Sequence, residues 1–78
     1  MSTTDRLFHI IHAMFSYGIT KPEMARTLDE LKTIVDVKEE EDLQKIMNQL
    51  VEEGYVSTLD SRFFLLGKGI VAVAAIFT

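Results

Sequence analysis

The sequence predicts a single α+β domain, mainly helical, in which three helices are followed by a short two-stranded hairpin and a closing apolar helix. Apolar residues recur at spacings of three and four in three separate segments. Two short runs rich in β-branched and aromatic residues flank a tight turn within residues 55–66. The length of 78 residues fits one domain spanning residues 1–78, and a composition that is 47% hydrophobic and 26% charged supports a packed core.

The first helix is predicted over residues 5–17. Six apolar residues fall on one side of this segment, and an arginine, two histidines and a serine fall on the other. Thr4 or Asp5 can cap its start, and Gly18 is a typical stop signal. In the link that follows, Pro22 suits the first position of one short helical turn.

Two further helices are predicted before the hairpin. In Thr27-Leu28-Asp29-Glu30 the threonine hydroxyl and the glutamate side chain can satisfy each other's backbone amides, so this capping box begins a helix that ends near Asp36. The next helix is predicted over residues 39–53, with Gly54 as its stop signal. Its buried stripe comprises Leu43, Ile46, Met47, Leu50 and Val51.

The hairpin is predicted from strands over residues 55–59 and 62–66, which are joined by Asp60-Ser61. With a two-residue loop, Val56 and Thr58 face Leu65 and Phe63 across the ladder and form its inward side. Arg62 then lies at the tip of the hairpin.

The end of the chain is expected to return to helix from Ile70 to Phe77, after Gly67-Lys68-Gly69 has broken the strand. Its valines and isoleucines also allow a strand. A helix that is apolar on every side cannot bury all its faces within one small protomer, so a two-fold homodimer is expected. The predicted dimer interface consists of Ile70, Val71, Val73, Ala74, Ile76 and Phe77.

Residues 27–69 resemble the winged helix-turn-helix family. The resemblance is carried by the capping box, by Leu43-x-x-Ile46-Met47-x-x-Leu50-Val51-Glu52-Glu53-Gly54-Tyr55-Val56, and by Phe63-Phe64-Leu65-Leu66-Gly67-Lys68-Gly69. It implies a transcriptional regulator that binds double-stranded DNA, with the third helix in the major groove and the hairpin, or wing, on the backbone or minor groove. The link over residues 18–26 is longer, and the wing shorter, than is usual in that family.

This resemblance identifies the residues expected to contact DNA. Glutamine and asparagine amides pair with adenine edges, and lysine contacts guanine or phosphate. Arg62, at the expected wing tip, can touch phosphate or enter the minor groove. The full set is Lys32, Lys38, Gln44, Lys45, Asn48, Gln49 and Arg62.

The charge of the chain weighs against that interpretation. Eight basic residues face twelve acidic ones, a formal net charge of −4, whereas proteins that neutralise phosphates are usually basic. Four consecutive acids, residues 39–42, begin the predicted third helix, although acids also favour a helix N-terminus through its dipole. The alternative function is a winged-helix protein–protein interaction module without DNA binding.

Several functional classes are not expected. The absence of cysteine removes disulfides and thiolate chemistry and suggests the cytoplasm. The N-terminus lacks an export signal, and the longest apolar run is far shorter than the roughly 20 residues of a membrane span. His9 and His12 lack a third ligand for a metal, and no serine has recognisable triad partners. We therefore expect neither an enzyme nor a cofactor.

Overall fold

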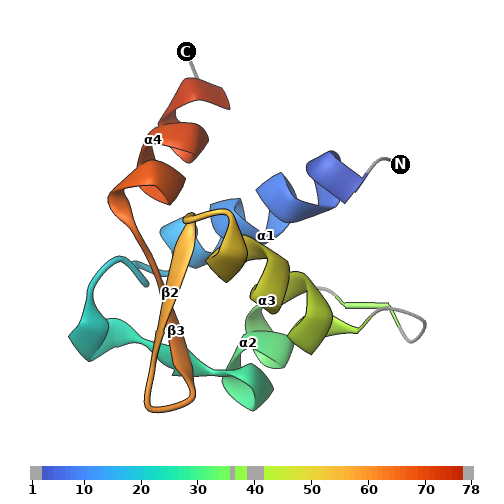
Figure 1. Ribbon diagram of the computed structural model, residues 1–78, viewed down its shortest axis with the longest axis vertical. Coiled ribbons are helices and arrows are strands. Elements are labelled where there is room, and N and C mark those ends of the chain that lie inside the picture. Colours follow the sequence, from blue (N-terminus) through green and yellow to red (C-terminus); the bar gives the residue numbers. More distant parts are fainter. Residues whose placement is uncertain (1–2, 36, 39–41, 77–78) are drawn as a thin grey trace.

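The computed structural model of the chain describes residues 3–35, 37–38 and 42–76 (Figure 1). This part of the chain is mostly helical, with four α-helices and one three-stranded antiparallel sheet, an arrangement compatible with a winged-helix fold. In chain order its elements are α1 (Thr3–Ser16), the 3-10 turn η1 (Pro22–Met24), β1 (Arg26–Thr27), α2 (Leu28–Ile34), α3 (Leu43–Glu52), β2 (Val56–Leu59), β3 (Arg62–Leu65) and α4 (Gly67–Ile76).

Helix α1 ends at the predicted glycine. Gly18 has a φ of +72°, the left-handed conformation that glycine adopts at little cost. Its N–H donates to the Phe15 carbonyl (2.9 Å), and the Ile19 N–H donates to the Met14 carbonyl (3.0 Å), the paired bonds of a Schellman ending. The stop signal is confirmed, as is the short helical turn at Pro22, which is η1.

Strand β1 was not predicted. It pairs with β3, placing Arg26 opposite Phe63 and Thr27 opposite Arg62, so β3 is the central strand and the order is β1-β3-β2. The prediction of a two-stranded sheet is therefore wrong by one strand. Two residues are too few to show the alternation that marks a strand. Thr27 also serves as the N-cap of α2, and its extended backbone (φ −71°, ψ 165°) suits both roles.

The capping box at the start of α2 is confirmed. The Thr27 N–H donates to Glu30 Oε1 (3.0 Å), and the Glu30 N–H donates to Thr27 Oγ1 (3.2 Å). The helix ends at Ile34, and Val35 is extended. It is therefore slightly shorter than predicted, and Asp36 lies outside the described residues.

Helix α3 begins later than predicted. Asp42 has an extended backbone (φ −104°, ψ 98°) and caps the helix, with Oδ1 accepting from the Lys45 N–H (3.2 Å). A helix running through Asp42 from residue 39 is therefore excluded, and residues 39–41 lie outside the described part. At its other end Gly54 is left-handed (φ +83°), which confirms the predicted stop.

The predicted hairpin loop and register are confirmed. Asp60 and Ser61 have φ values of 52° and 64°, so both loop residues are left-handed, as a type I′ turn requires. Val56 pairs with Leu65, and Thr58 pairs with Phe63. Of the four residues expected on the inward side, Val56, Phe63 and Leu65 are buried, whereas Thr58 is exposed.

Helix α4 includes the glycines that were expected to precede it. It begins at Gly67, so Gly67-Lys68-Gly69 form its first turn. A Cβ atom on Gly69 would lie 2.5 Å from the Tyr55 carbonyl oxygen and 2.9 Å from Leu65 Cδ2. Glycine is thus required for close packing at this point, where the sequence had predicted only a break of the strand before the helix.

Tyr55 joins the end of α3 to the start of α4. Its N–H donates to the Leu50 carbonyl (3.0 Å), which completes the ending of α3. Its carbonyl oxygen accepts from the Leu66 N–H (2.9 Å) and is the atom against which Gly69 packs. The Tyr55 main chain therefore fixes the position of α4 relative to α3.

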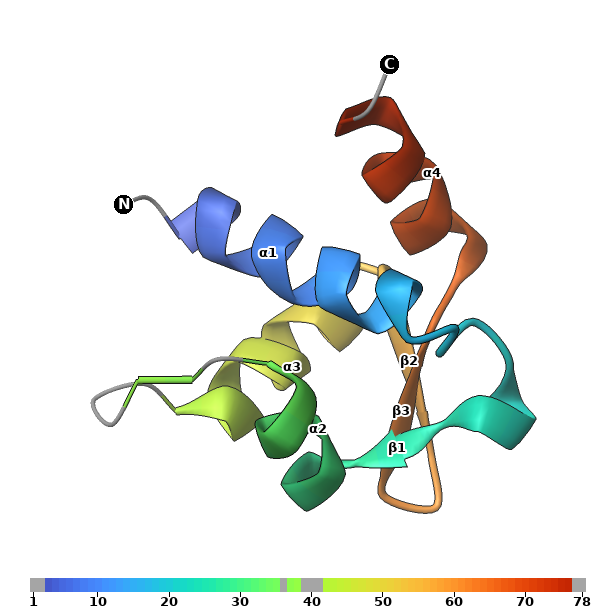
Figure 2. The same ribbon diagram turned by 180° about the vertical axis from the view of Figure 1, so that it is seen from behind.

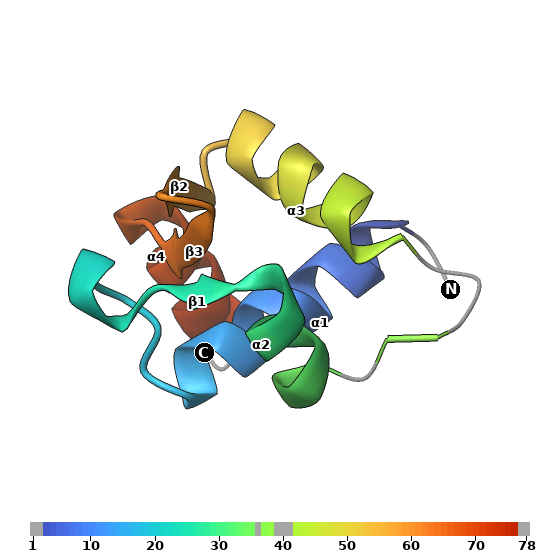
Figure 3. The same ribbon diagram turned by 90° about the horizontal axis from the view of Figure 1, so that it is seen from below.

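One hydrophobic core holds these elements together. It contains residues from every α-helix and from both strands of the hairpin, and no polar side chain is among its buried members. Figures 1 and 2 show α1 crossing above α2, α3 and the sheet, while α4 diverges from α1 and extends away from the body. Seen from below, α2 and α3 lie on one side of the sheet and η1 on the other (Figure 3).

Candidate nucleic-acid interface

Helix α3 separates a buried apolar face from an exposed polar one. Leu43, Met47 and Leu50 are buried in the core. Because helical side chains three and four apart share a face, this burial places the remaining polar residues outward. Gln44, Lys45, Asn48 and Glu52 are exposed, and Gln49 is half-buried.

Two of the predicted base-reading amides form a pair. Gln44 Nε2 donates to Asn48 Oδ1 (2.9 Å), one helical turn away. This bond uses one Gln44 N–H and one lone pair of Asn48, so the Gln44 oxygen and the Asn48 N–H groups remain as acceptor and donors. An adenine edge requires that combination of acceptor and donor.

The amide pair borders a groove of about 540 Å³ between the start of α2, α3 and the hairpin. Asp29 is the one charged residue among those that line it. The other polar groups there are hydroxyls and amides, which hydrogen-bond without attracting ions. The lining residues are Thr27, Leu28, Asp29, Gln44, Asn48, Val51, Thr58, Ser61 and Phe63.

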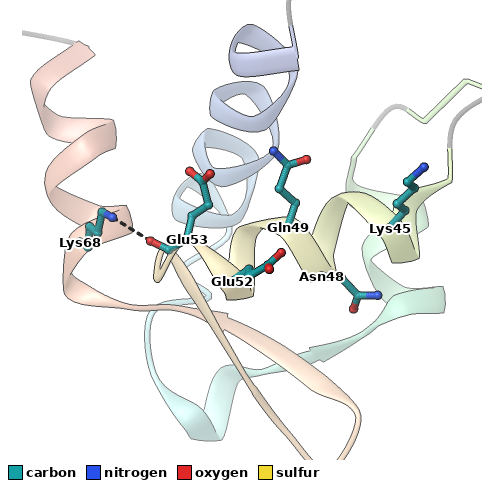
Figure 4. A pocket seen from close by; sticks show the side chains of 6 residues that line it. All are labelled: Lys45, Asn48, Gln49, Glu52, Glu53 and Lys68. Atoms are coloured by element: carbon teal, nitrogen blue, oxygen red, sulfur yellow. Dashed lines mark hydrogen bonds between the residues drawn. The ribbon is translucent and has the colours of Figure 1, made fainter.

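A second groove, of about 680 Å³, runs along α3 to the first turn of α4 (Figure 4). It is lined by two lysines, two glutamates and two amides: Lys45, Lys68, Glu52, Glu53, Asn48 and Gln49. Its formal charges cancel. Figure 4 shows Gln49 pointing to the side of α3 where α1 lies and Asn48 pointing away from it, so the two amides point to opposite sides of the helix.

Lys68 was not predicted as part of this region. Its Nζ donates to the Glu53 carbonyl oxygen (2.7 Å) and lies 4.6 Å from the centre of the Tyr55 ring. A cation near the last carbonyls of α3 is favourable for the dipole of that helix, and the ring adds a cation–π contact. No local sequence signal indicates such a contact, because the two bonded residues are fifteen positions apart.

The predicted acidic start of α3 requires correction. The first turn of the helix contains no acidic residue, because the helix begins at Leu43. Asp42 is its cap, and its Oδ1 is engaged by the Lys45 N–H. The three remaining acids, at positions 39–41, lie outside the described residues.

Arg62 lies where the predicted hairpin places it, directly after the two-residue loop. The tip consists of Asp60 and Ser61, and Arg62 begins β3, paired with both Leu59 and Thr27. The pKa of Glu30 is held below its usual value, mainly by the Thr27 backbone N–H and hydroxyl and further by the charges of Arg62 and Arg26. Arg62 therefore acts electrostatically on the start of α2.

The structure brings only some of the predicted DNA-contacting residues together at the two grooves. Gln44, Lys45, Asn48 and Gln49 line the two grooves. Lys32, in the last turn of α2, and Lys38, in the α2–α3 link, are exposed but line neither groove. Arg62 is exposed as well, and it lines neither groove.

Only some residues of the predicted dimer interface are exposed on the surface of the protomer. Val73 is 1% exposed and packs in the core of its own protomer, so its assignment to the interface is wrong. Ile70 is half-buried, whereas Val71 is 67% exposed and Ala74 is exposed. The side chain of Ile76, and Phe77 as a whole, lie outside the described residues.

No known protein family, curated protein or solved structure matches this chain. Among the described residues, no helix has the length and apolar character needed to cross a bilayer. Nor do three histidine or acidic side chains of the described part lie close enough together to hold a metal ion.

Proposed function

We propose that this chain is a winged-helix protein that binds double-stranded DNA through α3 and regulates transcription. The observation that carries the proposal is the outer face of α3, where the exposed Gln44 and Asn48 line a groove bordered by the hairpin and Lys45 is exposed on the same helix. Such side chains read base edges in the major groove. The Gln44–Asn48 pair favours adenine at the contacted position.

The distribution of exposed apolar residues supports DNA over a protein partner on this face. The large exposed hydrophobic side chains of the described residues are Phe15, Tyr17, Leu59 and Val71, none of which belongs to α3. Stable protein interfaces contain an apolar core surrounded by a polar rim. The outer face of α3 has no such core.

The balanced charges set limits on how DNA is bound. At most four of the predicted contact residues are cationic, namely Lys32, Lys38, Lys45 and Arg62. Phosphate neutralisation by four cations gives a salt slope of log K against log salt no steeper than about −4. Non-specific affinity is then weak, and hydrogen bonds to bases supply most of the discrimination.

Self-association through α4 is the second part of the proposal. Val71 and Ala74 are exposed on a helix that extends away from the body of the domain (Figures 1 and 2). Two-fold pairing of these helices buries apolar surface and presents two copies of α3 to two DNA half-sites.

A protein-interaction module without DNA binding is the second candidate function. The net charge of −4 and the cancelling charges of the second groove favour it. In that case Val71, Phe15 and Tyr17 contact another polypeptide, and the outer face of α3 remains solvated.

The experiment that tests the proposal is a salt-dependent titration of the full chain with random duplex DNA, followed by selection of preferred sequences. Replacing Lys32, Lys38, Lys45 or Arg62 by alanine is expected to reduce the salt slope by about one unit each. Lys21→Ala is the charge-matched control, because Lys21 is exposed next to η1, on the other side of the sheet from α3 (Figure 3). Slopes that stay unchanged in all four variants contradict DNA binding by this face.

Asn48→Ala tests the base contact separately from the charges. It is expected to lower discrimination at one adenine position by about 1–3 kcal/mol while leaving the salt slope unchanged. Equal affinity of the wild type for all selected and unselected sequences rules out base reading by the amide pair.

A further inference from the structure

A small cavity of about 130 Å³ lies between α1 and α3, and it is separate from the groove beside the hairpin. Leu7 and Ile11, one turn apart on α1, and Leu50 on α3 are buried residues that form its apolar walls. A cavity of about 150 Å³ with aliphatic and aromatic walls accommodates one benzene ring. The size and the walls therefore suit a ligand with a single small ring.

Aromatic side chains complete the walls. Phe8 and Tyr55 both line the cavity, with their ring centres 6.4 Å apart and their planes at 64°. This edge-to-face arrangement is favourable for aromatic pairs, and the same rings can contact a ring of a ligand. The aromatic pair joins α1 to the segment that follows α3.

The mouth of the cavity is polar and carries one charge. Gln49 and Glu53, one turn apart at the end of α3, are the polar residues that line the cavity. Glu53 is the one charged residue among them and the one lining residue that is exposed, so it marks the open side. Figure 4 shows both side chains pointing to the side where α1 lies. The nearby Lys68 bonds to the main-chain oxygen of Glu53 (2.7 Å), not to its carboxylate.

We propose that this cavity binds a small organic cation, consisting of one apolar ring and a primary ammonium group. The ring occupies the space between the apolar walls, and the ammonium group lies at the mouth beside the Glu53 carboxylate. A neutral ligand of the same size gains the apolar contacts alone, and an anionic one is repelled by Glu53. The site does not depend on whether α3 contacts DNA.

The test is a titration of the full chain, followed by NMR, with three ligands of equal size and different charge. We expect the order of affinity to be benzylammonium, benzyl alcohol, then benzoate, with a dissociation constant of the order of 1 mM for the cation. Glu53→Gln is expected to weaken benzylammonium binding by about two- to five-fold, the effect of a partly solvated charge pair, and to leave benzyl alcohol unchanged.

Glu52→Gln is the matched control, because Glu52 is exposed at the end of α3 and lines the second groove, which runs from α3 to α4, but not this cavity. A third variant, Gln49→Trp, blocks the mouth and is expected to abolish binding of all three ligands. Equal affinities for the three ligands, or equal effects of the Glu52 and Glu53 variants, overturn recognition of the charge. No binding of any ligand at 10 mM, or unchanged binding in Gln49→Trp, overturns the site.

Discussion

Helices α3 and α4 have the same length, ten residues each, but they expose opposite kinds of surface. Helix α3 buries one face and presents amides and charges on the other. Helix α4 buries Gly69 and Val73 and presents Val71, Ala74 and Ala75. A polar face suits a partner rich in hydrogen-bonding groups, such as the edge of a base, whereas an apolar face suits another protein surface. The two helices are thus expected to serve different partners.

The largest effect is expected where the two helices meet. Gly69→Ala introduces a Cβ atom 2.5 Å from the Tyr55 carbonyl oxygen, so the start of α4 must shift. We expect a loss at the upper end of about 1–3 kcal/mol in the free energy of unfolding, measured by chemical denaturation.

Gly67→Ala is the control for that variant. A Cβ atom on Gly67 has no neighbour within 4 Å, and alanine favours helix over glycine by up to about 1 kcal/mol. If Gly69→Ala is as stable as Gly67→Ala, Tyr55 does not determine the position of α4.

The two faces of α4 can be distinguished by a pair of valine substitutions. Val73→Ala removes two buried methyl groups and is expected to lower the free energy of unfolding by about 2 kcal/mol. Val71→Ala, at a position 67% exposed, is expected to change the stability of the protomer by less than about 0.5 kcal/mol and to weaken self-association, measured by sedimentation. Self-association that is unaffected by Val71→Ala removes the outer face of α4 from the interface.

The start of α3 is expected to show a smaller effect. Asp42→Ala removes the side-chain oxygen that accepts from the Lys45 N–H, and the loss of such a cap lowers stability by about 1 kcal/mol. Asp42→Asn retains a capping oxygen and is expected to remain close to the wild type. Equal losses in both variants indicate that the charge of Asp42, and not its hydrogen bond, stabilises the helix.

The smallest effect concerns Glu30 and depends on pH. Because the pKa of this carboxyl is below its usual 4.5 in the folded chain, its contribution is complete above that pH and is lost as the pH falls through the folded pKa. The difference in stability between the wild type and Glu30→Gln is therefore expected to shrink as the solution is acidified. A difference in stability that stays constant on acidification contradicts this role of the Glu30 carboxylate.

The fold was predictable where local signals repeat. Helical periodicity identified α1 and the buried stripe of α3, and the capping box identified the start of α2. The two-residue loop determined the register of the hairpin, because one slipped residue moves every side chain to the other face. These features depend on neighbours along the chain.

The features that sequence reasoning missed depend on contacts between distant segments. Strand β1 exists because β3 offers an edge for pairing, and Gly69 belongs to a helix because Tyr55 packs against it. When a helix is apolar on every side, its sequence does not show which valine packs into the core. Val73 was therefore assigned to the dimer interface, although it is buried in its own protomer. The Lys68 contact and the cavity beside Glu53 likewise require the folded arrangement.

The hairpin is closed at its base by the bond from the Leu66 N–H to the Tyr55 carbonyl (2.9 Å), and its tip is the exposed pair Asp60 and Ser61. Changes of length at the tip therefore leave the spacing of α3 and α4 intact. Each doubling of a flexible loop costs only about 0.6 kcal/mol. The tip is accordingly the place at which this small domain accepts an inserted peptide or label, and at which the hairpin can lengthen without a new core.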